Sequence, residues 1–107
     1  MRNVKIAAIQ MQCSTNLQTN LEKAEKMVRQ AAGDGAQIIL LPELFEREYF
    51  CQQRRYDFYH LAKPVEENDA VQMGMRLAKE LNVVLPISFY EQDINTLYNS
   101  IACIDAD

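Results

Sequence analysis

Two short aliphatic runs, separated by one amphipathic stretch, constrain the fold of this chain more than any other feature. The first run, VKIAAIQM, covers residues 4–11, and the second, QIILL, covers residues 37–41. Both alternate only weakly, which is typical of strands that are covered on both faces. The order strand, helix, strand within about 40 residues predicts a βαβ unit with parallel strands and a right-handed crossover.

The stretch between the two runs has the pattern of a helix with one buried face. Its apolar residues recur at spacings of four and three: Leu17, Leu21, Ala24, Val28 and Ala31. Thr19 and Glu22 match a capping box at the start, and Asn16 is an earlier cap candidate. Gly33 or Gly35 can end the helix, because glycine readily adopts the left-handed conformation found there.

The second half of the chain predicts further helices and a strand pair. We expect a short helix over residues 54–63 and a longer one over residues 68–81. Strands are expected over residues 83–90 and 97–105, and the short loop between them favours an antiparallel hairpin. The chain therefore belongs to the α/β class, with helices on a mixed sheet. Two longer helices cover one face of that sheet, so we expect the other face, or an edge, to need material that residues 1–107 do not supply.

Composition excludes several classes of function. The net charge is −4, and no basic face of the kind that binds nucleic acids is present in the sequence. No apolar run is long enough to span a membrane, and the amino-terminus has no signal-peptide pattern. Three cysteines without Cys-x-x-Cys spacing indicate reduced thiols and a cytoplasmic protein. With one histidine, a structural zinc site is not expected, and no motif for another metal or cofactor is present.

Glu43 is the residue that most suggests chemistry. It follows the second aliphatic run and Pro42, and ligands of open α/β sheets collect outside the carboxyl ends of strands. A carboxylate held there beside aliphatic residues is suited to act as a general base. The alternative is structural, since an acid at this position can also accept hydrogen bonds from loop N–H groups. Spacing alone leaves both interpretations open.

A general base needs a nucleophile, and the candidates within the chain are weak. Cys51 and His60 could form a nucleophile–base pair, although Cys51 follows two aromatic residues and is expected to pack as a small hydrophobic side chain. Cys13 and Cys103 stand at strand ends and are expected in the core. Glu46 could form a carboxylate dyad with the preceding acid, but its charged surroundings favour a solvated loop.

Several segments resemble one known family. The segments VKIAAIQM, GAQIILLPELF, LAKELNVVLPISFYE and YNSIACIDAD, in this order, resemble the amino-terminal third of the carbon–nitrogen hydrolases, also called the nitrilase superfamily. GAQIILLPELF is a specific signal for the superfamily. EREYFCQ and HLAKP are weaker signals that resemble its N-carbamoylputrescine amidase branch. The resemblance implies an α-β-β-α sandwich, of which residues 1–107 would form the amino-terminal portion of one domain.

The resemblance also implies an activity and site residues. The family uses a Glu-Lys-Cys triad without a cofactor, and its glutamate corresponds to Glu43, the general base for the cysteine thiol. The branch would hydrolyse N-carbamoylputrescine to putrescine, CO₂ and NH₃ in polyamine biosynthesis, so the partner is a small carbamoyl amine. Tyr49 resembles a family position near the substrate. Family members form homo-oligomers, and the same state is expected here.

The resemblance is incomplete at two of the three triad positions. The family motifs that carry the lysine and the cysteine do not occur in residues 1–107, so this chain alone is predicted to be inactive. Other branches, such as β-ureidopropionase and ω-amidase, share the PELF motif and remain alternatives. A different class of function is a non-catalytic piece that associates with a partner through its open sheet.

Overall fold

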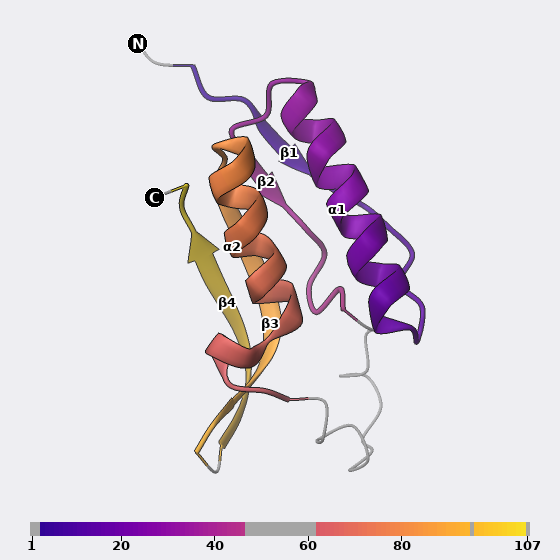
Figure 1. The fold of residues 1–107 in the computed structure, drawn as a ribbon, viewed down its shortest axis with the longest axis vertical. Helices are drawn as coiled ribbons and strands as arrows, with labels where there is room; N and C mark the ends of the chain where they lie inside the picture. The colour runs from indigo at the N-terminus through magenta and orange to yellow at the C-terminus, as the bar shows by residue number, and fades with distance from the viewer. Residues whose placement is uncertain (1–2, 47–61, 95, 107) are drawn as a thin grey trace.

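The part of the chain that the computed structural model describes, residues 3–46, 62–94 and 96–106, contains four strands and two α-helices. The elements follow the chain in the order β1 (Ile6–Ala8), α1 (Leu17–Gly33), β2 (Ile38–Leu40), the 3₁₀ helix η2 (Val65–Glu67), α2 (Asp69–Leu81), β3 (Leu85–Asp93) and β4 (Thr96–Ile104) (Figure 1). The predicted order is confirmed. The short helix expected over residues 54–63 falls almost entirely outside the described residues.

The strands form two two-stranded sheets, one of β1 and β2 and the other of β3 and β4. β1 and β2 are parallel, with Ile6 opposite Ile38 and Ala8 opposite Leu40. A parallel bridge between Ile38 and Val84 joins β2 to the segment that leads into β3. The predicted βαβ unit is therefore confirmed, although its strands are shorter than the aliphatic runs. Among the described residues β1 has a hydrogen-bonded neighbouring strand on one side, so fewer of its residues are held in regular pairing.

β3 and β4 form the predicted antiparallel hairpin, which is longer than expected. Its register places Leu85 opposite Ile104 at one end and Asp93 opposite Thr96 at the other. The polar residues near the tip had been expected to form a turn. They continue the ladder instead, because backbone pairing does not require apolar side chains in an exposed ribbon. The expected loop of five to six residues was therefore too long.

Both helices begin at asparagine caps. The Asn16 side chain accepts a hydrogen bond from the Thr19 backbone N–H at 2.8 Å, so the earlier cap candidate is the correct one. The Thr19 and Glu22 capping box was wrong, since both residues lie inside α1. Asn68, the first residue of the helix expected over residues 68–81, caps α2, and Asn82 ends it in the left-handed conformation at a φ of 56°.

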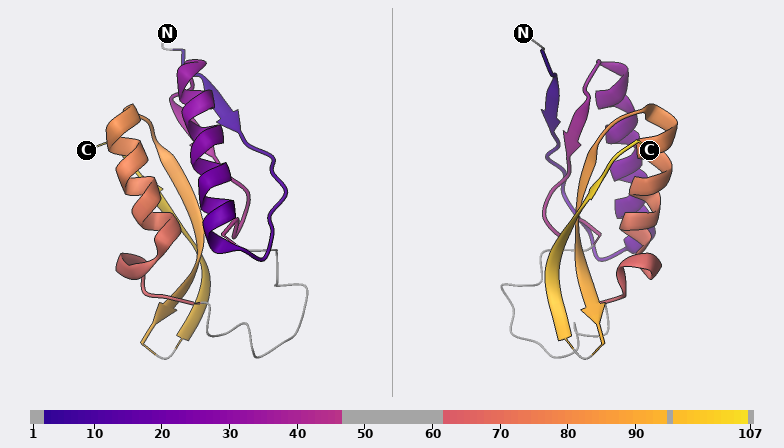
Figure 2. Two further views of the ribbon diagram at one scale, coloured as in Figure 1. Left: turned by 45° about the vertical axis from the view of Figure 1, so that its right-hand side comes forward. Right: turned by 90° about the vertical axis from the view of Figure 1, so that its left-hand side faces the viewer.

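Both helices pack on the same face of the strands, as Figure 2 shows in its right-hand view. The largest fully buried side chains of this layer are Val28, Ile39, Phe45, Leu77, Leu85 and Ile87. α2 approaches β3 and β4 closely at Gly74, where an added Cβ would lie 2.8 Å from Ile87 Cγ1 and 2.9 Å from Ile104 Cδ1. Glycine therefore sets the distance between this helix and the hairpin.

The opposite face of the strands carries exposed aliphatic residues. Ile6 is 71% exposed, Leu40 45% and Ile101 62%. Successive strand residues point to opposite faces, and the neighbours Ala7 and Ile39 face the helices. The described part of the chain thus has one covered face and one uncovered face, as the sequence predicted from two helices and strongly apolar strands.

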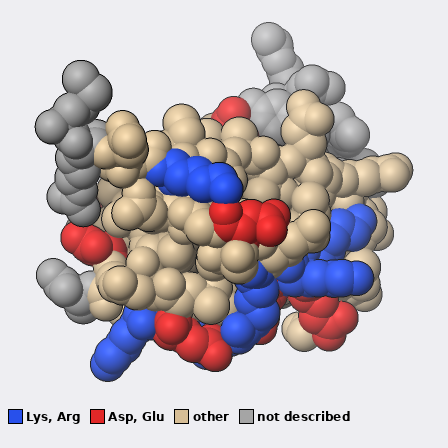
Figure 3. Space-filling model, turned by 90° about the horizontal axis from the view of Figure 1, so that it is seen from above, with Lys and Arg blue, Asp and Glu red and all other residues tan. Residues whose placement is uncertain are grey.

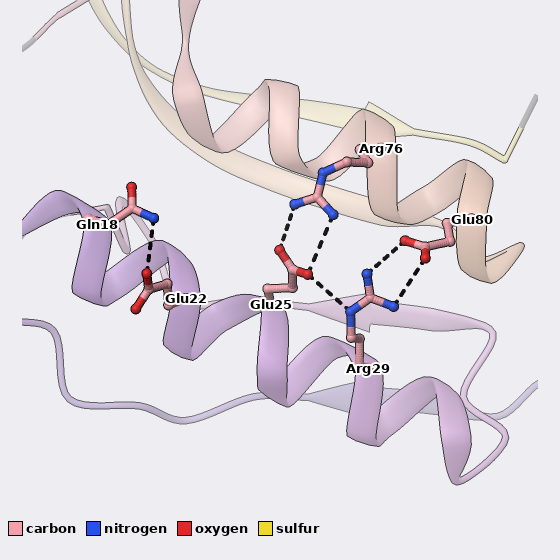
Figure 4. Close-up of polar contacts among 6 residues, drawn as sticks. All are labelled: Gln18, Glu22, Glu25, Arg29, Arg76 and Glu80. Carbon is pink, nitrogen blue, oxygen red and sulfur yellow. Dashed lines mark hydrogen bonds and ion pairs between the residues drawn. The ribbon is translucent and has the colours of Figure 1, made fainter.

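Ion pairs link the outer surfaces of the two helices. Arg76 of α2 contacts Glu25 of α1 at 2.6 Å, and Arg29 of α1 contacts Glu80 of α2 at 2.8 Å (Figure 4). Glu25 also accepts from Arg29 at 3.0 Å, so one carboxylate serves both guanidinium groups. The hydrogen bond from Arg76 is the main cause that lowers the pKa of Glu25. Figure 3 shows acidic and basic side chains intermixed on the face seen there.

Candidate active site

Glu43 lies just beyond the carboxyl end of β2, at the edge where the sequence placed it. Leu41 is buried, Pro42 follows, and residues 43–46 form a turn. The Glu43 side chain is exposed and reaches across to the hairpin, where the Asn99 amide nitrogen of β4 donates a hydrogen bond to its Oε1 atom. The carboxylate is therefore accessible and also held by a residue 56 positions later in the chain.

The residue after Glu43 fixes the course of the backbone. Leu44 has a φ of 50°, in the left-handed region that non-glycine residues seldom occupy. Its backbone N–H donates to the Ser88 hydroxyl of β3 at 3.0 Å, and its side chain is only 3% exposed. Phe45 is fully buried next to it. Burial and a hydrogen bond thus offset the strain of this turn, as is typical of functional sites.

The far side of the same turn is held by a buried asparagine. The Asn20 side chain of α1 is fully buried, and its amide nitrogen donates to the Glu46 carbonyl at 2.6 Å and to the Ser14 carbonyl at 2.7 Å. Its amide oxygen accepts from the Ser14 N–H at 2.8 Å. One side chain therefore ties the loop before α1 to the turn that carries Glu43.

A hollow of about 360 Å³ opens beside the carboxylate on the uncovered face. Its lining residues come from the end of β2, the following turn and the hairpin: Leu40, Leu41, Glu43, Ser88, Asn99, Ser100 and Ile101. Glu43 is the one ionisable residue among them, beside aliphatic side chains. This arrangement suits a carboxylate that exchanges a proton with a group entering the hollow.

Neither described cysteine lines this hollow. Cys13 is half-buried, and burial raises the pKa of its thiol against the smaller opposing effect of Lys23, so the reactive thiolate is disfavoured. Cys103 is exposed rather than in the core as expected, because it lies on the uncovered face of β4. Tyr49, Cys51 and His60 lie outside the described residues.

The sequence interpretation missed three residues that hold Glu43 or its turn: Asn20, Ser88 and Asn99. Each is a polar residue inside an apolar pattern. Asn20 interrupts the helix stripe between Leu17 and Leu21, while Ser88 and Asn99 interrupt apolar strands. Such interruptions could have flagged them, because a polar residue at a packed position needs a specific hydrogen-bond partner. Their partners lie too far along the chain for spacing to identify.

Comparison with known proteins assigns the chain to a family. The model of the family described as carbon-nitrogen hydrolase matches residues 5–107. The chain belongs to the carbon-nitrogen hydrolase family. The match includes the turn that carries Glu43 and the hairpin that holds it.

Two relatives of this family member are similar over nearly its full length. The N-carbamoylputrescine amidase of Arabidopsis thaliana is 48% identical over 106 residues, which are 99% of this chain and 36% of the relative. The citrullinase of Francisella tularensis subsp. tularensis is 46% identical over 107 residues, which are 100% of this chain and 37% of the relative. The chain thus spans about a third of the length of these relatives.

A solved structure supports the same fold. The carbon-nitrogen hydrolase of Helicobacter pylori G27 aligns with a TM-score of 0.86 at 23% identity, over 97% of this chain and 36% of that one. The α/β fold class of the nitrilase superfamily is therefore confirmed, with this chain as part of the fold. Within the described residues there is no group of three or more His, Cys, Asp or Glu side chains that could hold a metal, and no helix suited to cross a membrane.

Proposed function

We propose that this chain is the amino-terminal portion of an N-carbamoylputrescine amidase. The observation that carries the proposal is the identity of 47–48% to relatives of that name, among them those of Arabidopsis thaliana and Oryza sativa, over almost the whole chain. The accessible carboxylate beside an aliphatic hollow supports it. The substrate would be a small carbamoyl amine in the cytoplasm, as a step of polyamine biosynthesis.

Glu43 acts in this proposal as the general base. Its carboxylate takes the proton from the thiol of the family's cysteine, and the thiolate attacks the carbonyl carbon of the substrate's terminal ureide. The proton then passes to the departing nitrogen, which leaves as NH₃. Water, deprotonated by the same carboxylate, releases a carbamic acid that loses CO₂ to give putrescine. The family's lysine stabilises the oxyanion in both steps, and Tyr49 contacts the substrate.

The cysteine and the lysine of this scheme belong to motifs that residues 1–107 do not contain. We therefore expect the 107-residue chain alone to release no ammonia from N-carbamoylputrescine. We also expect the full-length protein to be a homo-oligomer. Size-exclusion chromatography of both forms tests the alternative of a non-catalytic association piece, which requires the short chain to bind the full-length one.

A second candidate is citrulline hydrolysis, which the 46% identity to the Francisella tularensis citrullinase favours. Citrulline and N-carbamoylputrescine share a ureide at the end of an aliphatic chain and differ at the far end, where citrulline carries an added carboxylate. The chemistry at Glu43 would be the same for both. Recognition of the far end then decides between them.

The test compares substrates and one matched pair of variants in the full-length protein. Ammonia release is measured with N-carbamoylputrescine, citrulline, β-ureidopropionate and a linear ω-amide, and the highest kcat/KM is expected for the first. Glu43→Gln should lower kcat about 10³-fold or more, because it removes the base. Glu22→Gln, on the exposed surface of α1, is the control and should leave kcat unchanged. Preference for another substrate, or full activity of Glu43→Gln, would contradict the proposal.

A further inference from the structure

Three hydrogen bonds link four polar groups in a ring around the turn that carries Glu43. The Leu44 backbone N–H donates to the Ser88 hydroxyl at 3.0 Å, and that hydroxyl lies 3.5 Å from the Asn99 amide oxygen. The Asn99 amide nitrogen then donates to the Glu43 carboxylate. The ring starts at the residue after Glu43 and returns to Glu43 itself, so the hairpin holds both the backbone and the side chain of the turn.

The hydrogen bonds of this ring follow one another in a fixed order: Leu44 donates to Ser88, Ser88 to Asn99, and Asn99 to the carboxylate. A backbone N–H can only donate, so the Ser88 hydroxyl must accept from Leu44 and keeps its own hydrogen for another partner. The Asn99 oxygen is that partner, at a longer distance. An asparagine whose oxygen faces Ser88 turns its NH₂ group to the other side, where an ionised carboxylate can only accept. Ser88 thereby selects the amide orientation that binds Glu43.

The two hairpin residues are well placed for this task because β3 and β4 are regularly paired. Ser88 is 8% exposed on β3, and Asn99 lies on the adjacent β4 strand, opposite Tyr90. Rigid elements hold a site more accurately than loops do. The turn residues Glu43 and Leu44 belong to a loop and gain this accuracy from the hairpin.

We propose that Asn99, oriented by Ser88, is a positioning residue that holds the Glu43 carboxylate in the geometry for proton transfer. The proposal rests on the proposed role of Glu43 as general base. It acts on the base alone, so removal of Asn99 should lower kcat more than it changes KM. Substrate binding depends on the remainder of the hollow.

Kinetics of the full-length protein test this role. Asn99→Ala should lower kcat about 10- to 100-fold, the effect of losing one hydrogen bond to a charged group, with KM changed less than about threefold. Asn99→Asp has the same shape but places a second carboxylate against Glu43, so its kcat should fall further than that of Asn99→Ala. Ser88→Ala should lower kcat less than either, and Ser88→Thr, which retains the hydroxyl, should restore it.

Asn16→Ala is the matched control, because the hydrogen bond that it removes joins the Asn16 side chain to the Thr19 N–H within α1 and not to Glu43. It should lower the melting temperature and leave kcat unchanged. An Asn99→Asp variant as active as the wild type would overturn the proposal. The proposal would also be overturned if Asn99→Ala lost activity only through a lower melting temperature, with the kcat of the folded protein unchanged, or if Ser88→Thr were no more active than Ser88→Ala.

A spectroscopic measurement separates this proposal from the proposed function. The side-chain amide protons of Asn99 should shift in the NMR spectrum of the full-length Glu43→Ala variant, since their charged acceptor is removed. Glu22→Ala should leave them unchanged. If the protein hydrolyses no carbamoyl amine but the Asn99 signals shift, the proposed function is wrong and the Asn99–Glu43 contact is still supported. Asn99 signals that do not respond to Glu43→Ala overturn the contact whatever the substrate.

Discussion

The two faces of the strands differ sharply in what covers them, although their residues are similar. On the helix-facing side Ile39 is fully buried, whereas its neighbour Leu40, on the other side of the same strand, is 45% exposed. The hairpin repeats the contrast, with Ile87 fully buried and Ile101 62% exposed. Aliphatic residues on both faces therefore indicate strands that are covered by a layer on each side, and the described residues supply one of these layers.

This contrast explains where the hollow lies. Leu40 and Ile101 line it from the uncovered face, and Glu43 enters it from the end of β2. The covered face fixes the position of the strands, and the uncovered face is left to form one wall of a site. In the proposed enzyme, this chain thus supplies the general base and one wall of the substrate site, and the remainder of the protein would supply the opposite wall.

The largest expected effect separates two adjacent residues of β2. Ile39→Ala should reduce the free energy of unfolding by about 3 kcal/mol, because it leaves a cavity in the core. Leu40→Ala should cost only about 1 kcal/mol in the 107-residue chain, where half of that side chain already contacts water. Urea unfolding of both variants checks this. Equal losses would contradict the contrast between the faces, and a larger loss for Leu40→Ala in the full-length protein would sharpen it.

The next effect concerns the buried amide that holds the Glu43 turn from the helix side. Asn20→Ala should cost about 2 kcal/mol, because it leaves backbone groups of Ser14 and Glu46 without their buried partner. Gln18→Ala, on the exposed side of α1, is the control and should change stability by less than about 0.5 kcal/mol. Chemical denaturation measures both. If the two variants unfold at the same urea concentration, the Asn20 network contributes little.

A smaller effect is expected from two helical glycines. Gly74→Ala should cost about 1 kcal/mol, since the new methyl group meets Ile87 and Ile104 and outweighs the gain in helix propensity. Gly33→Ala places its methyl group in open space at the end of α1 and should be neutral or slightly stabilising. Thermal unfolding distinguishes them. A stabilised Gly74→Ala variant would mean that the covered face is looser than described.

The smallest effect comes from the ion pairs above the covered face. Hydrogen bonds from Arg76 and Arg29 lower the pKa of Glu25, so their stabilisation is present above the ordinary carboxyl pKa of 4.5 and is lost as the pH falls through the lower folded value. Arg76→Ala should cost about 0.5 kcal/mol at neutral pH, because the groups are partly exposed. The difference in stability from the wild type should shrink at low pH. It should also shrink in about 0.5 M salt, where the Debye length falls to a few ångströms and charges are screened. An unchanged difference would exclude an ionic cause.

Most of the fold could be predicted because its signals are local. The weak alternation in residues 4–11 and 37–41 and the helical pattern of residues 17–31 depend on neighbours within a few positions. Glu43 could be located by the same logic, since it follows a buried strand. Its role as a base stays a prediction, as does that of Tyr49, which lies outside the described residues.

The ring around Glu43 could not be predicted for a physical reason. Leu44 and Ser88 are 44 positions apart, and Asn99 and Glu43 are 56 apart, so no periodicity relates them. The exact end of each hairpin strand was also beyond the pattern, because backbone pairing at an exposed tip leaves little trace in side-chain type. The exposure of Cys103 was misjudged because its strand is apolar on a face that no described segment of the chain covers.

The hydrogen bonds of Asn20 have a consequence for the order of folding. Its bond to Ser14 spans six positions, while its bond to Glu46 spans 26 and encloses the entire crossover from α1 to β2. The first can form as soon as the start of the helix does, but the second must wait until β2 has docked. Until then the amide remains hydrated. We therefore expect the docking of β2 to remove water from Asn20 and to set the Glu43 turn in place together.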